Sequence, residues 1–209
     1  MMKVLNLYSG IGGNRKLWPS DIEVTAVENN PEIAKIYQDF FPCDKVIVGD
    51  AHQFLLEHFS EFDFIWSSPP CPTHSQFRFR CGVKAWGQEP KFPDMKLYEE
   101  IIFLKYHSKS KYVVENVESY YEPLIKPQEL SRHYFWANFH IPIKKGFQSL
   151  QIKLSEIREL QILHEISLEN YKIDEKRKIL RNCVEPRLGL HIFNSAMTPT
   201  QLKINEVTI

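Results

Sequence analysis

Residues 3–13 read KVLNLYSGIGG, a short apolar run that ends in a serine and a glycine-rich turn. This pattern is typical of a buried strand followed by a tight turn, where glycines let a ligand approach the backbone. It is not the Gly-x-Gly-x-x-Gly pattern of dinucleotide-binding folds. The stretch therefore predicts a strand whose carboxyl end opens onto a ligand, although a purely structural turn explains the glycines about as well.

Strand and helix signals alternate outward from this stretch. Further strands are expected at residues 22–27, 45–48, 62–66 and 111–114, and helices at residues 31–40 and 95–106. Such alternation predicts an α/β fold with a mostly parallel sheet and helices on both faces. The second half differs, with a strand-like segment at residues 131–139 and helical patterns at residues 150–163, 174–181 and 186–196.

The composition narrows the class of protein. The chain has 209 residues, of which 43% are hydrophobic and 25% charged, as in a globular domain. Lysines and arginines number 26 and so do the acids, so a nucleic acid would have to bind through a local basic patch. No apolar run approaches the ~18 residues of a membrane span, and no signal peptide is evident. The four cysteines form no Cys-x-x-Cys pair, which favours a reduced, cytoplasmic protein without a zinc site.

Polar residues end several of the expected strands. Glu28 ends the second strand, where an acid commonly accepts hydrogen bonds from ribose hydroxyls, and Asp50 ends the third, where it can accept from an adenine amino group. Each acid alone is as well explained by a solvated strand end. Because the carboxyl ends of parallel strands meet at one edge of the sheet, the two acids and the glycine turn together predict an adenosine pocket.

Cys71 follows two prolines at the end of the fourth expected strand. The prolines stop the strand and present the thiol at the sheet edge, which favours a nucleophile over a buried cysteine that acts as a small hydrophobe. Glu115 follows the neighbouring strand, where it can protonate a ring nitrogen of a substrate, or can simply cap a turn.

Taken in order, these motifs resemble those of the DNA cytosine-5 methyltransferases. The blocks that carry the resemblance are Leu7 to Gly13, Val27-Glu28-Asn29, Gly49-Asp50, Ser68-Pro69-Pro70-Cys71 with Ser75, Asp94-x-Lys96, Glu115-Asn116-Val117, Gln128-x-x-x-Arg132 and Asn182-Cys183-Val184-x-Pro186. They cover about two thirds of the chain. The Pro-Cys and Glu-Asn-Val blocks are specific to the family, whereas the glycine turn is not.

The resemblance implies a Rossmann-like class I fold, S-adenosylmethionine as cofactor with S-adenosylhomocysteine as product, and no metal. Its partner is DNA with the target cytosine flipped out of the duplex. Cys71 would attack carbon 6 of the ring, Glu115 would bind N3 and the exocyclic amine, and Arg132 would hold O2. The implied cofactor-binding residues are Tyr8, Ser9, Gly10, Ile11, Gly12, Gly13, Glu28, Asn29, Asp50, Ala51, Pro70 and Asn182. The implied substrate-binding residues are Ser75, Arg78, Arg80, Lys84 and Asn116.

Four residues depart from the family pattern. Pro72 stands where the family has Gln, Leu130 replaces the first arginine of its block, Asn6 replaces Asp in the first strand, and Arg181 stands in place of Gly. None removes the three catalytic residues. We expect Arg181 to point into solvent, the alternative being that it tunes cofactor binding.

Residues 76–92 carry four basic side chains against one acid, interleaved with aromatic residues. Such a segment directly after Cys71 suits a loop that closes over a flipped base and grips phosphates, although an ordinary solvated loop shares this composition. His74 and His133 lie beside the motif blocks; packing is the expected role of both, with DNA contact as the alternative.

The family normally carries a large target-recognition domain before its last block. Here residues 140–179 take its place, so we divide the chain into a catalytic core at 1–139, a reduced helical insertion at 140–179 and a returning C-terminal segment at 180–209. A short or relaxed target site, or recognition through a partner chain or a second copy, follows from this shortness. The same reaction on tRNA and a non-catalytic regulatory role are the alternative functions.

Overall fold

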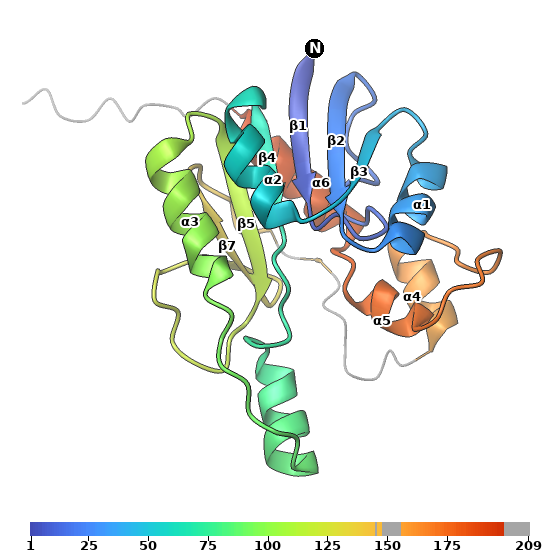
Figure 1. Ribbon diagram of the computed structural model, residues 1–209, viewed down its shortest axis with the longest axis vertical. Coiled ribbons are helices and arrows are strands. Elements are labelled where there is room, and N and C mark those ends of the chain that lie inside the picture. Colours follow the sequence, from blue (N-terminus) through green and yellow to red (C-terminus); the bar gives the residue numbers. More distant parts are fainter. Residues whose placement is uncertain (145, 148–155, 199–209) are drawn as a thin grey trace, which may run out of the picture.

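The structure is a computed structural model that describes residues 1–144, 146–147 and 156–198. Its centre is a seven-stranded sheet in the order β3-β2-β1-β4-β5-β7-β6 (Figure 1). The strands are β1 (Met2–Leu7), β2 (Ile22–Glu28), β3 (Lys45–Val48), β4 (Phe64–Ser67), β5 (Lys111–Val117), β6 (Gln128–Leu130) and β7 (His133–Ala137). The first five pair in parallel, whereas β7 runs antiparallel to both β5 and β6. The predicted α/β fold with a mostly parallel sheet is confirmed.

Helices flank the sheet on both faces. They are α1 (Pro31–Phe40), α2 (Ala51–His58), α3 (Lys96–His107), α4 (Ile157–His164), α5 (Lys176–Arg181) and α6 (Pro186–Met197), with two shorter or irregular helices, η1 (Phe59–Glu61) and the π-helix η2 (Arg78–Ala85). Helix α1 has the predicted bounds because the side chain of Asn30 accepts from the amides of Glu32 and Ile33, and Pro31 begins its first turn.

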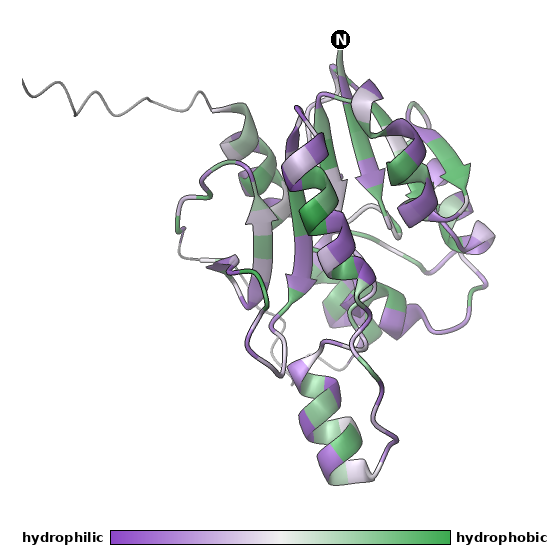
Figure 2. Cartoon of the chain, turned by 60° about the vertical axis from the view of Figure 1, so that its left-hand side comes forward, coloured by the Kyte–Doolittle hydropathy of each residue, from purple (hydrophilic) through white to green (hydrophobic). Residues whose placement is uncertain are grey.

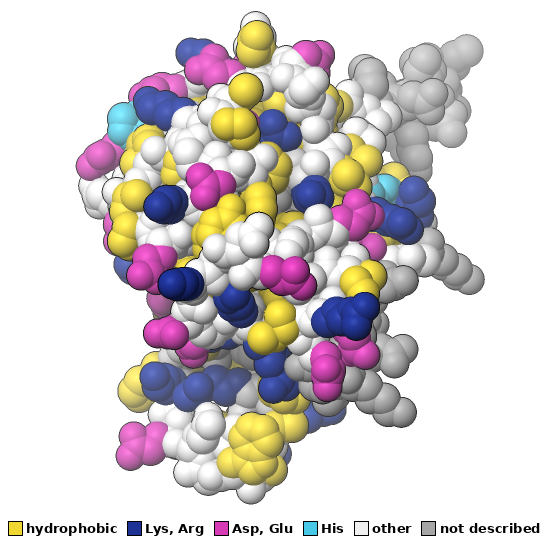
Figure 3. Space-filling model, turned by 90° about the vertical axis from the view of Figure 1, so that its right-hand side faces the viewer, with side chains coloured by type: hydrophobic (Ala, Val, Ile, Leu, Met, Phe, Trp, Pro, Cys, Tyr) yellow, Lys and Arg dark blue, Asp and Glu magenta, His cyan; other side chains and the backbone are white. Residues whose placement is uncertain are grey.

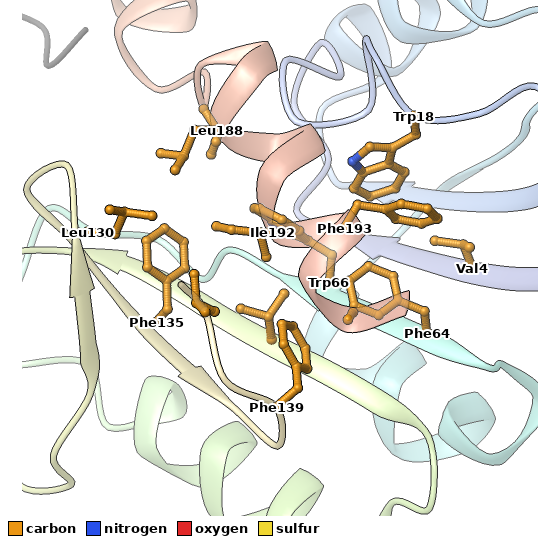
Figure 4. Packing of buried hydrophobic residues seen from close by; sticks show 14 of the residues in the cluster. Val4, Trp18, Phe64, Trp66, Leu130, Phe135, Phe139, Leu188, Ile192 and Phe193 are labelled. Carbon is orange, nitrogen blue, oxygen red and sulfur yellow. The ribbon is translucent and has the colours of Figure 1, made fainter. Parts of the chain in front are cut away.

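Two hydrophobic clusters hold helices against the sheet. On one face Leu55 of α2 and Leu104 of α3 pack against the alternating apolar residues of the central strands. On the other face α6 packs against Phe64 and Trp66 of β4 (Figure 4). The indole of Trp18 stacks on Phe193 at 5.2 Å and donates to the carbonyl of Gly189, so the end of the described chain covers its beginning.

A third cluster lies beyond the carboxyl ends of β1 and β2. Ile11 of the glycine turn and Ile36 of α1 pack there against Leu160 of α4 and Leu180 of α5. Because α4 and α5 contact each other on this side, they form a roof over the strand ends, at the lower right of Figure 1. We use the name roof for residues 156–184.

Several element bounds differ from expectation. Helix α2 was not predicted, and Asp50 turns out to be its N-cap, accepting from the amides of His52 and Gln53. Strand β5 continues to Val117 because β7 pairs with its polar end. Helix α4 begins only at Ile157, and the expected helical residues 150–155 lie outside the described residues.

Residues 76–92 form an arm that projects from the sheet edge, with η2 at its centre (Figure 1). The hydropathy colouring of Figure 2 places most hydrophobic residues in the central strands and the faces that cover them, whereas the arm carries both kinds. Lys and Arg side chains gather on the arm in Figure 3. Within the described ranges, no helix has both the length and the apolarity that a membrane crossing requires.

Candidate active site

Two cavities meet at Cys71 beyond the carboxyl ends of the strands. The first has a volume of about 460 Å³ and extends from Cys71 over the ends of β1 and β2. The second has a volume of about 610 Å³ and extends toward the turn between β6 and β7. Residues that line both are Cys71, Val117, His133, Glu175, Lys178, Arg181 and Asn182. The thiol therefore stands where two separate ligands would meet.

The glycine turn and Glu28 form the far end of the first cavity. The amide of Gly10 donates to one carboxylate oxygen of Glu28 and the amide of Asn30 donates to the other, both at 3.0 Å. A side chain on Gly10 would meet no atom within 4 Å, so its backbone faces open space. Beside it the buried hydroxyl of Ser9 has no hydrogen-bond partner among the described residues. This end of the cavity therefore has polar groups that are available to bind a ligand.

The neighbouring glycines serve chain packing instead. A Cβ on Gly12, where φ is +82°, would lie 2.3 Å from the ring of Phe41. A Cβ on Gly13 would lie 2.6 Å from the carbonyl oxygen of Val184 in the roof. Gly12 and Gly13 are therefore needed for close packing. Only Gly10 has the role predicted from the sequence, which is to let a ligand approach the backbone.

Other predicted cofactor residues divide between the cavity and its surroundings. Those that line the first cavity are Tyr8, Ser9, Gly10, Ile11, Gly13, Glu28, Asn29, Pro70 and Asn182. Asp50 and Ala51 lie at the start of α2 and are not part of this lining, because the Asp50 carboxylate caps the helix. The hydroxyl of Tyr8 donates to the buried carboxylate of Glu100 at 2.6 Å; burial and that carboxylate raise the pKa of Tyr8, which keeps it a donor.

The first cavity fits an adenosine-containing cofactor. Its far end combines a carboxylate with room for ribose hydroxyls, an unpartnered hydroxyl and an open backbone. Glu28 already accepts two amides, yet each carboxylate oxygen retains a further lone pair for a hydroxyl donor. The residues that would hold the cofactor are therefore those of the β1 turn, the end of β2 and the roof.

A short loop fixed to β5 presents Cys71. The side-chain amide of Asn116 donates to the carbonyl of Pro69 at 3.0 Å, and its oxygen accepts from the amide of Val117. The amides of His74 and Ser75 both donate to the Cys71 carbonyl at 3.0 Å. Asn116 was predicted to bind substrate, but both polar atoms of its side chain form hydrogen bonds that hold the loop.

The environment of the thiol opposes its ionisation. Burial, and then the negative charge of Glu115, raise the pKa of Cys71 to about 11. In the free protein Cys71 is therefore a thiol at neutral pH, and a bound ligand must favour the thiolate before it can act as a nucleophile.

Glu115 lines the first cavity and pairs with His133, a residue for which the sequence favoured a packing role. Its carboxylate is 2.6 Å from Nδ1 of His133, which is the first residue of β7. Glu115 is 6% exposed, and His133 lines both cavities. Arg132, the arginine of the Gln128-x-x-x-Arg132 block, lies in the turn before β7. It is exposed, and its side chain lines the second cavity.

The second cavity is rich in basic side chains. Besides Arg132, the roof contributes Arg177, Lys178 and Arg181, against the acids Glu118 and Glu175. The expectation that Arg181 points into solvent was wrong: it is only partly exposed, lines both cavities, and its guanidinium lies 5.9 Å from the ring centroid of Phe77. It faces inward because α5 is anchored through Leu180, which is fully buried.

The predicted substrate residues of the arm lie at different depths. Ser75 lines the second cavity and Arg78 a smaller one beside it, whereas Arg80 and Lys84 are exposed on η2. Lys84 lies over the ring of Phe79, which stacks on Tyr120 and so anchors the arm. In contrast, His74 is 1% exposed, with Nδ1 2.6 Å from the Tyr121 hydroxyl, which removes it from any contact with DNA.

Two departures from the family pattern have packing explanations. Asn6 is fully buried and exchanges side-chain hydrogen bonds with Asn14. Leu130 is buried in the cluster beneath α6, a place where an arginine would lose its hydration (Figure 4).

The sheet order with its antiparallel β7, and the two cavities at the carboxyl strand ends, define a Rossmann-like class I S-adenosylmethionine-dependent methyltransferase. The chain belongs to the C-5 cytosine-specific DNA methylase family, whose model matches residues 2–124.

Solved structures similar to this chain include methyltransferases from several organisms. A mutant DNMT2 of Spodoptera frugiperda is 26% identical, with a TM-score of 0.38 over 56% of this chain and 36% of that one. A DNA modification methyltransferase from an E. coli prophage is 17% identical, with a TM-score of 0.37 over 58% and 34%. An Agrobacterium tumefaciens SAM-dependent methyltransferase is 16% identical, with a TM-score of 0.39 over 57% and 40%. The chain thus spans about a third of the length of the first two. No curated protein matches.

Proposed function

We propose that this protein transfers a methyl group to carbon 5 of cytosine in DNA through a covalent bond between Cys71 and carbon 6 of a flipped base. The observation that carries the proposal is the position of Cys71, at the junction of an adenosine-type cavity and a basic cavity, with Glu115 in the lining of the first of them. A flipped base entering from the basic side would meet the thiol and the carboxylate together.

The residues divide the chemistry among them. The proton of Cys71 passes through water in the cavity to the Glu115 carboxylate, and the thiolate forms a bond to carbon 6 while the carbon 5–carbon 6 π pair moves to carbon 5. Glu115 donates a proton to N3 and so prevents negative charge from building up on the ring. S-adenosylmethionine, when bound, supplies the methyl group that carbon 5 takes. Loss of the carbon 5 proton to water then re-forms the double bond, expels the Cys71 thiolate and returns the N3 proton to Glu115.

Basic groups around the second cavity hold the nucleic acid. Arg132 donates to O2 of the base from the second cavity, and the exposed Arg80 and Lys84 of the arm contact phosphates. Their charge is local, which agrees with a chain whose net charge is zero.

The deciding experiment offers the protein two nucleic acids with tritiated S-adenosylmethionine. We expect label in DNA, none in tRNA, and complete loss of label in Cys71→Ala. The matched control is Cys43→Ala, because Cys43 is an exposed cysteine remote from both cavities. Label only in tRNA would move the reaction to RNA, and absence of label from both would favour a non-catalytic protein.

The covalent step has its own test. DNA that contains 5-fluorocytosine has no proton to lose at carbon 5, so the bond to Cys71 should persist and retard the protein on a denaturing gel. The adduct should form with Cys43→Ala and fail with Cys71→Ala. Methylation without an adduct would remove Cys71 from the nucleophile's role.

Target choice follows from the shortness of residues 140–179. With so little chain available to read base edges, we propose a recognition site shorter than about six base pairs, or help from a partner chain or second copy. A bisulfite map of DNA methylated by the purified protein gives the site, and sedimentation during the assay gives the assembly. A longer site read by a monomer contradicts this part of the proposal.

A further inference from the structure

The pairing of Glu115 with His133 follows from the register of two strands. In the antiparallel pair β5 and β7, His133 stands opposite Val117 and Phe135 opposite Glu115. Glu115 and His133 are therefore diagonal neighbours on the same face of the sheet, within reach of long side chains. The Nδ1 atom of His133 lies 2.6 Å from Oε1 of Glu115, and the ring of Phe135 stacks beside the imidazole at 6.2 Å.

Arg132 is directed elsewhere by the turn that precedes β7. Ser131 and Arg132 are the two residues between β6 and β7, and both have positive φ, +52° and +66°. A two-residue hairpin turn of this kind normally uses Asn and Gly, so the backbone here is held in a strained conformation. The turn places Arg132 at an exposed tip that lines the second cavity, and it leaves His133 as the first strand residue, facing Glu115.

His133 is also exposed enough to respond to what fills the cavities. Its side chain is 27% exposed, against 8% for that of Glu115, and both residues line the first cavity. The other charged or titratable groups that line the second cavity with it are Cys71, Glu118, Arg132, Glu175, Arg177, Lys178 and Arg181, and the first cavity adds Tyr8, Glu28, Glu32, Asp174 and Cys183. Only Glu115 forms an ion pair with it among the described residues.

We propose that His133 is the positioning residue of Glu115 and holds Oε1 so that Oε2 faces N3 of the cytosine. This rests on the proposed function for its catalytic consequence. A hydrogen bond from Nδ1 to Oε1 fixes the carboxylate rotamer, and the same donor offsets part of the carboxylate charge that raises the pKa of Cys71. The pair thus sets both the direction of proton delivery and the ionisation of the nucleophile.

The first test needs no turnover. The rate at which iodoacetamide alkylates Cys71 at about pH 8 follows the thiolate fraction. His133→Phe should slow this alkylation several-fold, because the uncompensated Glu115 charge further disfavours the thiolate. In a Glu115→Gln background the same change should have no effect, since His133 acts on the thiol only through the Glu115 carboxylate. Equal effects in the two backgrounds would overturn the pairing.

The second test reads the catalytic consequence with DNA as substrate. His133→Phe should lower kcat by about 10²-fold with little change in the KM for S-adenosylmethionine, and His133→Arg should restore much of it. His133→Gln, which keeps a donor toward Oε1, should retain part of the activity, and its pH profile of kcat should differ from that of the wild type because a carboxamide cannot exchange protons as an imidazole can. The control is His107→Phe, an exposed histidine on α3.

The outcomes separate the two proposals. The role of His133 would be merely structural if His133→Phe lost activity and melted at a lower temperature, His133→Arg did not restore the activity, and the pH profile did not change. Unchanged activity in His133→Phe would also overturn the proposal. A wild-type protein that methylates neither nucleic acid would refute the proposed function, while the alkylation cycle would still decide whether His133 controls Glu115.

Discussion

The two cavities that meet at Cys71 hold their polar groups in different ways. In the first, Glu28 is fixed by two backbone amides and the glycine turn is locked by close packing. In the second, Arg132 and the basic residues of the roof are carried on a strained turn and a six-residue helix. A preformed pocket suits a small ligand of constant shape, whereas basic side chains around an open cavity suit a polymer whose phosphates vary in position. The comparison teaches that one site can use rigidity on one side and charge on the other.

The largest effect is expected at Glu115, which lines the first cavity together with Cys71. Glu115→Gln should lower kcat by about 10²- to 10⁴-fold, because the amide cannot donate a proton to N3. The same change removes the negative charge that is the second cause of the raised pKa of Cys71, so that pKa should fall below about 11 and alkylation should be faster. Steady-state kinetics and iodoacetamide alkylation measure the two effects. Glu129→Gln, an exposed acid on β6, is the control, and slower alkylation in Glu115→Gln would contradict the electrostatic explanation.

The next prediction concerns the buried histidine of the roof, His164, and the pH dependence of stability. His164 is 1% exposed between α4 and α5, and burial lowers its pKa from 6.5 to about 4. The folded state therefore binds fewer protons than the unfolded state between these values, and the free energy of unfolding should fall by roughly 3 kcal/mol as the pH drops from 6.5 to 4. Denaturant titrations at several pH values measure this slope. His164→Leu should flatten it and His140→Leu should not, and an equal slope in both variants would rule out His164 as the cause.

Within the rigid cavity, the carboxylate of Glu28 should matter through its geometry. Glu28→Gln leaves one of the two amides without an acceptor and weakens the contact to ribose hydroxyls, so we expect cofactor binding to weaken about tenfold. Isothermal titration with S-adenosylhomocysteine measures it. Glu23→Gln, exposed on the same strand, should bind normally; unchanged affinity in Glu28→Gln would place the adenosine elsewhere.

The smallest effect is expected in the second cavity, where several basic side chains would contact the nucleic acid. Arg181→Ala should raise the KM for DNA about threefold and reduce the salt dependence of binding by about one phosphate contact, with little effect on cofactor affinity. Arg187→Ala, exposed on α6, is the comparison variant. If Arg181→Ala weakened the cofactor and spared DNA, the division between the two cavities would be wrong.

The sequence predicts the elements around the first cavity better than those around the second, for physical reasons. Strands β1 to β4 and helix α1 follow from apolar periodicity and from Pro31 and Asn30, which act locally. Helix α2 was missed because it has only eight residues, and because the acid at its start, Asp50, drew attention as a cofactor contact and not as an N-cap. The role of Arg181 depends on tertiary packing that no local pattern encodes.

The same distinction explains which site residues could be found. Cys71 and Glu115 stand in motifs, and the structure brings both to the cavity wall. The pairing of His133 depends on the register of β7 against β5, which a turn of Ser131 and Arg132 determines without the usual glycine. An alternating pattern in residues 133–137 was the available signal, because it places His133 and Phe135 on one face.

The contact between Trp18 and Gly189 has a consequence for how the protein is made. These residues are 171 positions apart, and Gly13 is covered by Val184 in the same way. During synthesis the glycine turn leaves the ribosome long before the residues that cover it, so the nascent first half must wait with an open apolar edge. A chain halted after residue 124, although it contains the whole stretch matched to the family, would still lack this cover. The first cavity therefore takes its shape only after the roof has been made, because residues 173–184 supply part of its lining.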